Sequence, residues 1–147
     1  MKVFADRLFN VLENHRREIA QQWCKAVMQN PRTPAFNNFP EEELLKRGGF
    51  FYKNLTKMYF GEKPYTEVRK YFSEYAEVGF QNKIPLHELL YAMILMRRHL
   101  WLYAEVQAPF LSAMDHQQAI ETINKTIRIF DHGIYVVTQK YCELEKQ

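Results

Sequence analysis

The chain has 147 residues, of which 47% are hydrophobic and 15% aromatic, and this composition excludes a disordered polypeptide. The 20 lysines and arginines exceed the 17 aspartates and glutamates by three and form no dense basic block, which disfavours nucleic acid as the main partner. The length suits one domain, residues 1–147, with a core that needs neither a metal ion nor a disulfide.

The cysteines and the apolar segments bear on location. Cys24 and Cys142 match no zinc-binding or CxxC spacing, so we expect free thiols in a reducing cytoplasm. The first 18 residues carry Asp6 and Glu13 and no long apolar run, unlike a signal peptide. The most apolar stretch, residues 89–96, is shorter than the ~20 residues that span a bilayer. We therefore expect a cytoplasmic protein that does not enter the membrane.

Apolar residues recur at spacings of three and four, which predicts helices and no strand. The first predicted helix covers residues 3–30, and a loop rich in proline and asparagine follows it to residue 40. The second begins at Pro40 and ends at Gly61. Within it, Gly48 and Gly49 indicate either close approach to a neighbouring helix or a local bend.

Three further helices are predicted in the second half of the chain, at residues 66–82, 86–108 and 116–145. Pro85 opens the second of these, and Asp115 is the predicted N-cap of the last. The last helix carries apolar residues close to a heptad seam. The predicted fold is all-α, a single bundle of about five helices.

Motifs for catalysis and for metal binding are missing from the sequence. None of the five histidines lies in a Glu-x-x-His or HExxH pattern, and there is no phosphate-binding glycine loop or GxSxG. A cysteine–histidine pair is left open but not favoured. We expect a protein that is not an enzyme and that has no cofactor and no metal site.

His15 falls on the apolar stripe of the first predicted helix. We prefer to interpret it as a core histidine that is hydrogen-bonded to a carbonyl or a carboxylate. The alternative is a haem or metal ligand, which would also need a distal partner.

The segment MILMRRHLWLYAE, residues 93–105, places two arginines and a histidine in an apolar run. On a helical wheel, Arg97 falls in the middle of a broad core-facing side, whereas Arg98 and His99 point outward in other directions. A second, narrower apolar stripe lies opposite the first and consists of Tyr91, Leu95 and Leu102. It predicts that this helix is either central in the bundle or in contact with another subunit.

Burying an unpaired guanidinium is costly, so the wheel requires a partner for Arg97. We prefer a structural ion pair, with Glu77 or Asp131 as its carboxylate. The alternative is an anion-binding role for Arg97 at the bottom of a ligand pocket.

Most of the chain resembles a known family, least so across residues 31–60, and two stretches carry the resemblance. LENHRREIAQQWCKAV, residues 12–27, resembles the opening helix of the RsbRD-type N-terminal domain, the sensory module of stressosome co-antagonist proteins. YAEVGFQNKIPLHELLYAMILMRRHLWLYAE, residues 75–105, resembles that family's second hallmark, including its Arg-Arg-x-Leu-Trp end. The resemblance implies a somewhat globin-like helical bundle that dimerises and regulates an output domain, and it implies no catalytic residues. The chain stops where a STAS, kinase or regulator domain would begin, so we expect either a free-standing module or part of a longer protein.

These observations lead to one main hypothesis, a non-catalytic stress-signalling sensor module that acts through protein–protein contacts. We expect a homodimer, joined through the second stripe of the fourth predicted helix or the seam of the fifth, and a signalling partner such as an output domain or a kinase. The alternative is a ligand- or haem-binding helical sensor, in which His15 and Arg97 are the first candidates for ligand contact.

Overall fold

The computed structural model describes the backbone of residues 3–107 and 113–147 and the side chains of residues 5–63, 65–102 and 117–147. Over these residues the chain forms five α-helices and one 3-10 helix, without a strand, which confirms the predicted all-α bundle. The elements are α1 (Val3–Gln29), η1 (Pro34–Phe36), α2 (Glu41–Phe60), α3 (Pro64–Gln81), α4 (Leu86–Gln107) and α5 (Ala113–Glu145).

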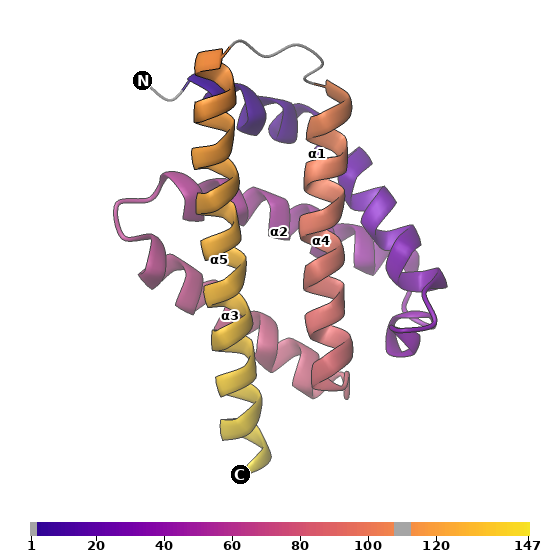
Figure 1. Ribbon diagram of the computed structural model, residues 1–147. Coiled ribbons are helices and arrows are strands. Elements are labelled where there is room, and N and C mark those ends of the chain that lie inside the picture. Colours follow the sequence, from indigo (N-terminus) through magenta and orange to yellow (C-terminus); the bar gives the residue numbers. More distant parts are fainter. Residues whose placement is uncertain (1–2, 108–112) are drawn as a thin grey trace.

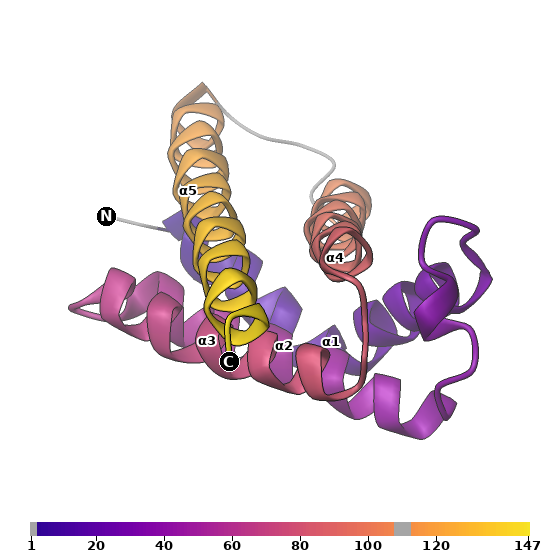
Figure 2. The same cartoon turned by 90° about the horizontal axis from the view of Figure 1, so that it is seen from below.

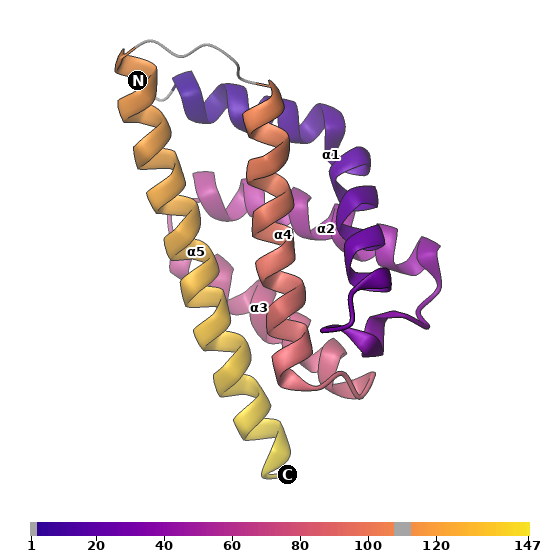
Figure 3. The same cartoon turned by 45° about the vertical axis from the view of Figure 1, so that its right-hand side comes forward.

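The helices form two layers. In Figure 1, α4 and α5 run antiparallel in front, while α1, α2 and α3 cross behind them. The view from below shows α4 and α5 standing on one side of the layer made by the other three helices (Figure 2). The main packing partners across and within the layers are α3 with α5, α1 with α2, and α1 with α4. The C-terminal end of α5 extends past the bundle (Figure 3).

The helix ends follow the prolines and glycines of the sequence. Pro40 occupies the N-cap position of α2, three glutamates fill its first turn near the positive end of the dipole, and Gly61 follows its last residue. Proline at position 64 starts α3 two residues earlier than predicted. The N-cap prediction for Asp115 was wrong, because α5 starts at Ala113 and Asp115 lies in its first turn.

The sequence pattern predicted one straight helix over residues 3–30, but the structure shows a break in it. His15 has non-helical backbone angles, φ −122° and ψ 19°, and α1 kinks at this residue. Figure 3 shows its N-terminal part crossing behind α4 and its C-terminal part turning down along the bundle. The kink changes the phase of the apolar stripe, which matters for the position of His15.

The core combines aliphatic side chains with large aromatic ones from both layers, and the aromatic ones include Trp23, Phe51 and Phe130. Gly48 allows α2 to approach α1 closely, because a Cβ there would lie 3.0 Å from Cε3 of Trp23. This confirms close approach for Gly48, whereas a Cβ at Gly49 would meet nothing within 4 Å. None of the helices, over the residues described, is long and apolar enough to cross a membrane.

Candidate functional site

The outer side of α4 and α5 carries a shallow apolar groove. Ile94 and Trp101 line it from α4, and Ile123 and Ile127 line it from α5. Ile120, one turn before Ile123, continues the same side of α5 and is 59% exposed. We call this surface the α4/α5 face; it consists of Ile94, Arg97, Arg98, Trp101, Ile120, Ile123 and Ile127.

The face exists because α5 is apolar on two adjacent sides. Phe130 and Val137 are buried against the rest of the bundle. Ile120, Ile123 and Ile127 are spaced by three and four residues, so they share a different side of the helix and are partly or largely exposed. A helix with a second apolar side either lies at the centre of a bundle or contacts another molecule.

Trp101 is the polar member of the groove that has no partner. Its indole Nε1 is buried and makes no hydrogen bond with any residue in the described part of the chain. An unmade hydrogen bond of a buried donor costs free energy. An acceptor brought by a molecule seated in the groove would recover this cost.

Arg97 lies at the edge of this groove rather than inside the bundle. Its Nη1 is 3.9 Å from Oδ1 of Asp131, and the two side chains are 31% and 64% exposed. The other predicted partner, Glu77, instead pairs with Lys140, with 3.1 Å between Nζ and Oε1. The guanidinium carbon of Arg97 also lies 6.0 Å from the centre of the Phe130 ring. The helical wheel predicted Arg97 in the middle of the core-facing side of α4. This was wrong, because that side is centred on neighbouring residues such as Met93, Met96 and Leu100, which are buried.

The other two polar residues of the segment differ from each other. Arg98 is exposed and lines the groove. His99 is half-buried, and burial lowers the pKa of its imidazole, with a further lowering from the charge of Arg98. The predicted separation of the three residues therefore holds for His99 but not for the two arginines, because Arg97 and Arg98 line the same groove. His99 is also less exposed than the outward-facing residue that the wheel predicted.

The three residues of the predicted interface stripe lie in different surroundings. Leu95 is 2% exposed and belongs to the core of the chain itself. Tyr91 is half-buried, and the guanidinium of Arg32 lies 5.9 Å from the centre of its ring. Leu102 is 48% exposed and is the member of the stripe most open to a partner.

His15 lies at the kink of α1 and not in the core. Its Nδ1 is 3.3 Å from Oε1 of Glu18, and its side chain is 37% exposed. The structure therefore brings His15 to a carboxylate, as the preferred interpretation expected, but at the surface. Within the described ranges, no group of three or more histidine, cysteine, aspartate or glutamate residues is arranged to hold a metal ion.

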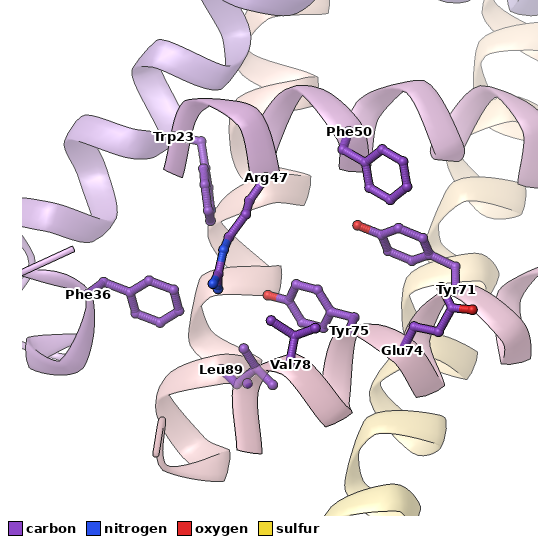
Figure 4. Close-up of a pocket in the computed structure, with 10 residues that line it drawn as sticks. Trp23, Phe36, Arg47, Phe50, Tyr71, Glu74, Tyr75, Val78 and Leu89 are labelled. Carbon is purple, nitrogen blue, oxygen red and sulfur yellow. The ribbon is translucent and has the colours of Figure 1, made fainter. Parts of the chain in front are cut away.

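A second candidate site is an apolar cavity of about 170 Å³ within the layer of α1, α2 and α3, lined by residues of these helices and of η1 and by Leu89 of α4. The guanidinium of Arg47 and the hydroxyl of Tyr75 point into it (Figure 4). Sequence reasoning missed both residues. Tyr75 continues the aromatic stripe of α3 and resembles any core tyrosine, and only the tertiary fold brings it close to Arg47.

Comparisons of the chain with protein-family models, with curated proteins and with solved structures gave no match. The resemblance to the RsbRD-type domain therefore rests on the sequence itself, chiefly on residues 12–27 and 75–105. The two candidate sites are assigned by their own geometry.

Proposed function

We propose that the chain is a non-catalytic regulatory module that acts through protein–protein contacts and forms a homodimer through the α4/α5 face. The observation that carries this proposal is the apolar groove between α4 and α5, with Ile120 and Leu102 exposed on either helix. Contiguous apolar surface of this kind is typical of protein interaction sites.

A second copy of the chain fits this face well. Two antiparallel helices with apolar outer sides complete a four-helix bundle when a two-fold axis brings two such pairs together. A two-fold interface must be self-complementary, and both signs of charge lie at this face. Arg97 and Arg98 line it from α4, and the exposed Asp131 of α5 lies beside it, 3.9 Å from Arg97. In such a dimer, the arginines of one copy approach the carboxylate of the other.

The regulatory role is supported by the family resemblance of residues 12–27 and 75–105, which implies a stress-signalling sensor coupled to an output domain or a kinase. Both described cysteines are free thiols, and Cys142 is exposed. An exposed free thiol suits a reducing compartment, which supports the proposed cytoplasmic location.

The dimer is tested by size-exclusion chromatography with light scattering at tens of micromolar. We expect a dimer for the unaltered chain and a monomer for Ile120→Glu or Ile127→Glu. A carboxylate buried without a partner in the interface weakens association by about a hundredfold or more. Tyr65→Glu is the matched control, since Tyr65 is a 56% exposed apolar residue of α3, and it should stay dimeric. A monomeric unaltered chain at this concentration would contradict the proposed dimer.

The haem-sensor alternative is distinguished by absorbance. The position of His15 at an exposed kink, 3.3 Å from Glu18, does not favour an axial haem ligand. A Soret band in the purified protein would nevertheless replace the proposal with the haem alternative. An absent band in protein purified after haem supplementation keeps the regulatory proposal.

A further inference from the structure

The cavity in the layer of α1, α2 and α3 has mainly apolar walls. Trp23 and Phe36 on one side and Leu89 on another are buried side chains that line it. Its volume of about 170 Å³ is close to the ~150 Å³ of an engineered protein cavity that holds benzene. The space therefore suits a body about as large as one aromatic ring, well below a drug-sized ligand.

One polar atom inside this cavity lacks a partner. The hydroxyl oxygen of Tyr75 is buried and makes no hydrogen bond within the described part of the chain. Figure 4 shows that it points toward the guanidinium end of Arg47. Burial raises the pKa of the Tyr75 phenol well above its ordinary value, with Tyr141 adding to the rise and the Arg47 charge opposing it. The hydroxyl is therefore protonated at neutral pH and available as a donor.

Arg47 lies at the mouth of the cavity, and two contacts outside the cavity fix the position of its side chain. Its Nη2 donates to Oε1 of Glu43 at 2.8 Å, and its guanidinium carbon lies 5.0 Å from the centre of the Phe39 ring. A guanidinium carries five N–H donors, so the bond to Glu43 leaves others for a ligand. Glu74 also lines the cavity, but it is exposed and its side chain points away from Arg47 (Figure 4).

A hydroxyl donor and a guanidinium that converge on an apolar space match a carboxylate attached to an apolar body. We propose that this cavity binds a small carboxylic acid about the size of one aromatic ring. Its carboxylate accepts hydrogen bonds from Tyr75 and Arg47, and its apolar part packs against Trp23, Phe36 and Leu89. The site goes beyond the proposed regulatory function and does not depend on it, because the cavity and the α4/α5 face share no residue.

The proposal is tested by isothermal titration calorimetry of the purified chain at pH 7 with three probes that share a phenyl ring and differ in charge. These are phenylacetate, its neutral analogue 2-phenylethanol, and the cationic 2-phenylethylamine. We expect phenylacetate to bind at least about tenfold more tightly than the alcohol, since charge-assisted hydrogen bonds are the stronger ones, and the amine not to bind. Arg47→Met keeps much of the apolar stem and should remove the preference for the acid.

Tyr75→Phe separates a ligand-binding role from a structural one. Without ligand, its melting temperature should stay the same or rise by about 2–4 °C, because a buried hydroxyl without a partner is removed. Its affinity for phenylacetate should fall about tenfold. Tyr52→Phe is the matched control, since the Tyr52 hydroxyl donates to the carbonyl of Met96 at 2.8 Å. That control should melt lower and bind phenylacetate as the unaltered chain does.

Filling the cavity provides an independent check. Val78 lines its mouth and is 41% exposed, so Val78→Trp should fold and should block the binding of phenylacetate and of the alcohol. Three results would overturn the proposal. They are equal binding of the acid and the alcohol, binding of phenylacetate that survives Val78→Trp, and the failure of phenylacetate to bind at millimolar concentration.

Discussion

Trp23 of α1 donates its indole N–H to the backbone carbonyl of Ala92 on α4 at 3.0 Å. One turn further along α4, Tyr52 of α2 donates its hydroxyl to the carbonyl of Met96 at 2.8 Å. A carbonyl oxygen has two lone pairs, so each of these two carbonyls can accept a side-chain donor in addition to a helical N–H. Both rings are buried. The back layer therefore fixes the position of α4 through two specific bonds as well as through apolar contact.

Replacing the first of these donors should lower stability measurably. For Trp23→Phe we expect the free energy of unfolding to fall by about 2–4 kcal/mol, from the lost hydrogen bond together with the volume lost in the core. The measurement is urea denaturation followed by circular dichroism. Tyr65→Phe, which alters a side chain that is 56% exposed, should leave the midpoint unchanged. An unchanged midpoint for Trp23→Phe would show that the indole bond contributes nothing.

Two helix-interior glycines give opposite expectations for the same substitution. A Cβ at Gly133 of α5 would lie 2.6 Å from Cε2 of Phe72 on α3, and Phe72 is 0% exposed. A buried ring has little room to move, so Gly133→Ala should cost about 1–3 kcal/mol despite the better helix propensity of alanine.

At Gly49 the same change meets open space, because nothing lies within 4 Å of its Cβ position. Gly49→Ala should therefore stabilise the protein by about 0.5–1 kcal/mol, the ordinary gain of alanine over glycine in a helix. Thermal unfolding of both variants checks the pair. Equal effects at the two positions would contradict the close packing of α3 against α5.

The positions of the helices could be predicted from the sequence, because their signals are local. Pro85 predicted the start of α4 at Leu86, and the structure places it there. The kink at His15 could not be predicted, because helix periodicity assumes a straight helix and no proline or glycine lies at that position. For the same reason the wheel placed His15 on the core side. The cavity also left no sequence signal, because Trp23 and Tyr75 meet only through the packing of separate helices.

The pairing of Arg97 gives a prediction that separates a surface ion pair from a buried one. Its contact with Asp131 is 3.9 Å long and both side chains reach solvent, at 31% and 64% exposure. Exposed pairs contribute at most about 1 kcal/mol, so Arg97→Met should change the free energy of unfolding by less than that amount. The variant should be measured at a concentration where the chain is monomeric, by urea denaturation.

Glu88→Leu is the contrasting variant for Arg97→Met. Glu88 is 5% exposed and accepts a hydrogen bond from the backbone N–H of Ala35 at 2.7 Å, which ties η1 to α4. Leaving that N–H without an acceptor should cost about 1–3 kcal/mol. A larger loss for Arg97→Met than for Glu88→Leu would mean that the charge of Arg97 is structurally essential.

The environment of His99 predicts a loss of stability in mild acid. Burial, and then the charge of Arg98, lowers the pKa of this imidazole below its ordinary value of 6.5. Between the lowered pKa of the folded state and about 6.5, the unfolded chain binds more protons than the folded chain, so stability rises with pH across that window. This contribution to stability is fully present above pH 6.5 and is lost as the pH falls toward the pKa of His99 in the folded state.

The melting temperature of the unaltered chain should therefore fall more between pH 7 and pH 5 than that of His99→Gln. In an NMR titration, the pKa of His99 should lie below its ordinary value of 6.5, and a pKa at or above that value would contradict the burial of the imidazole.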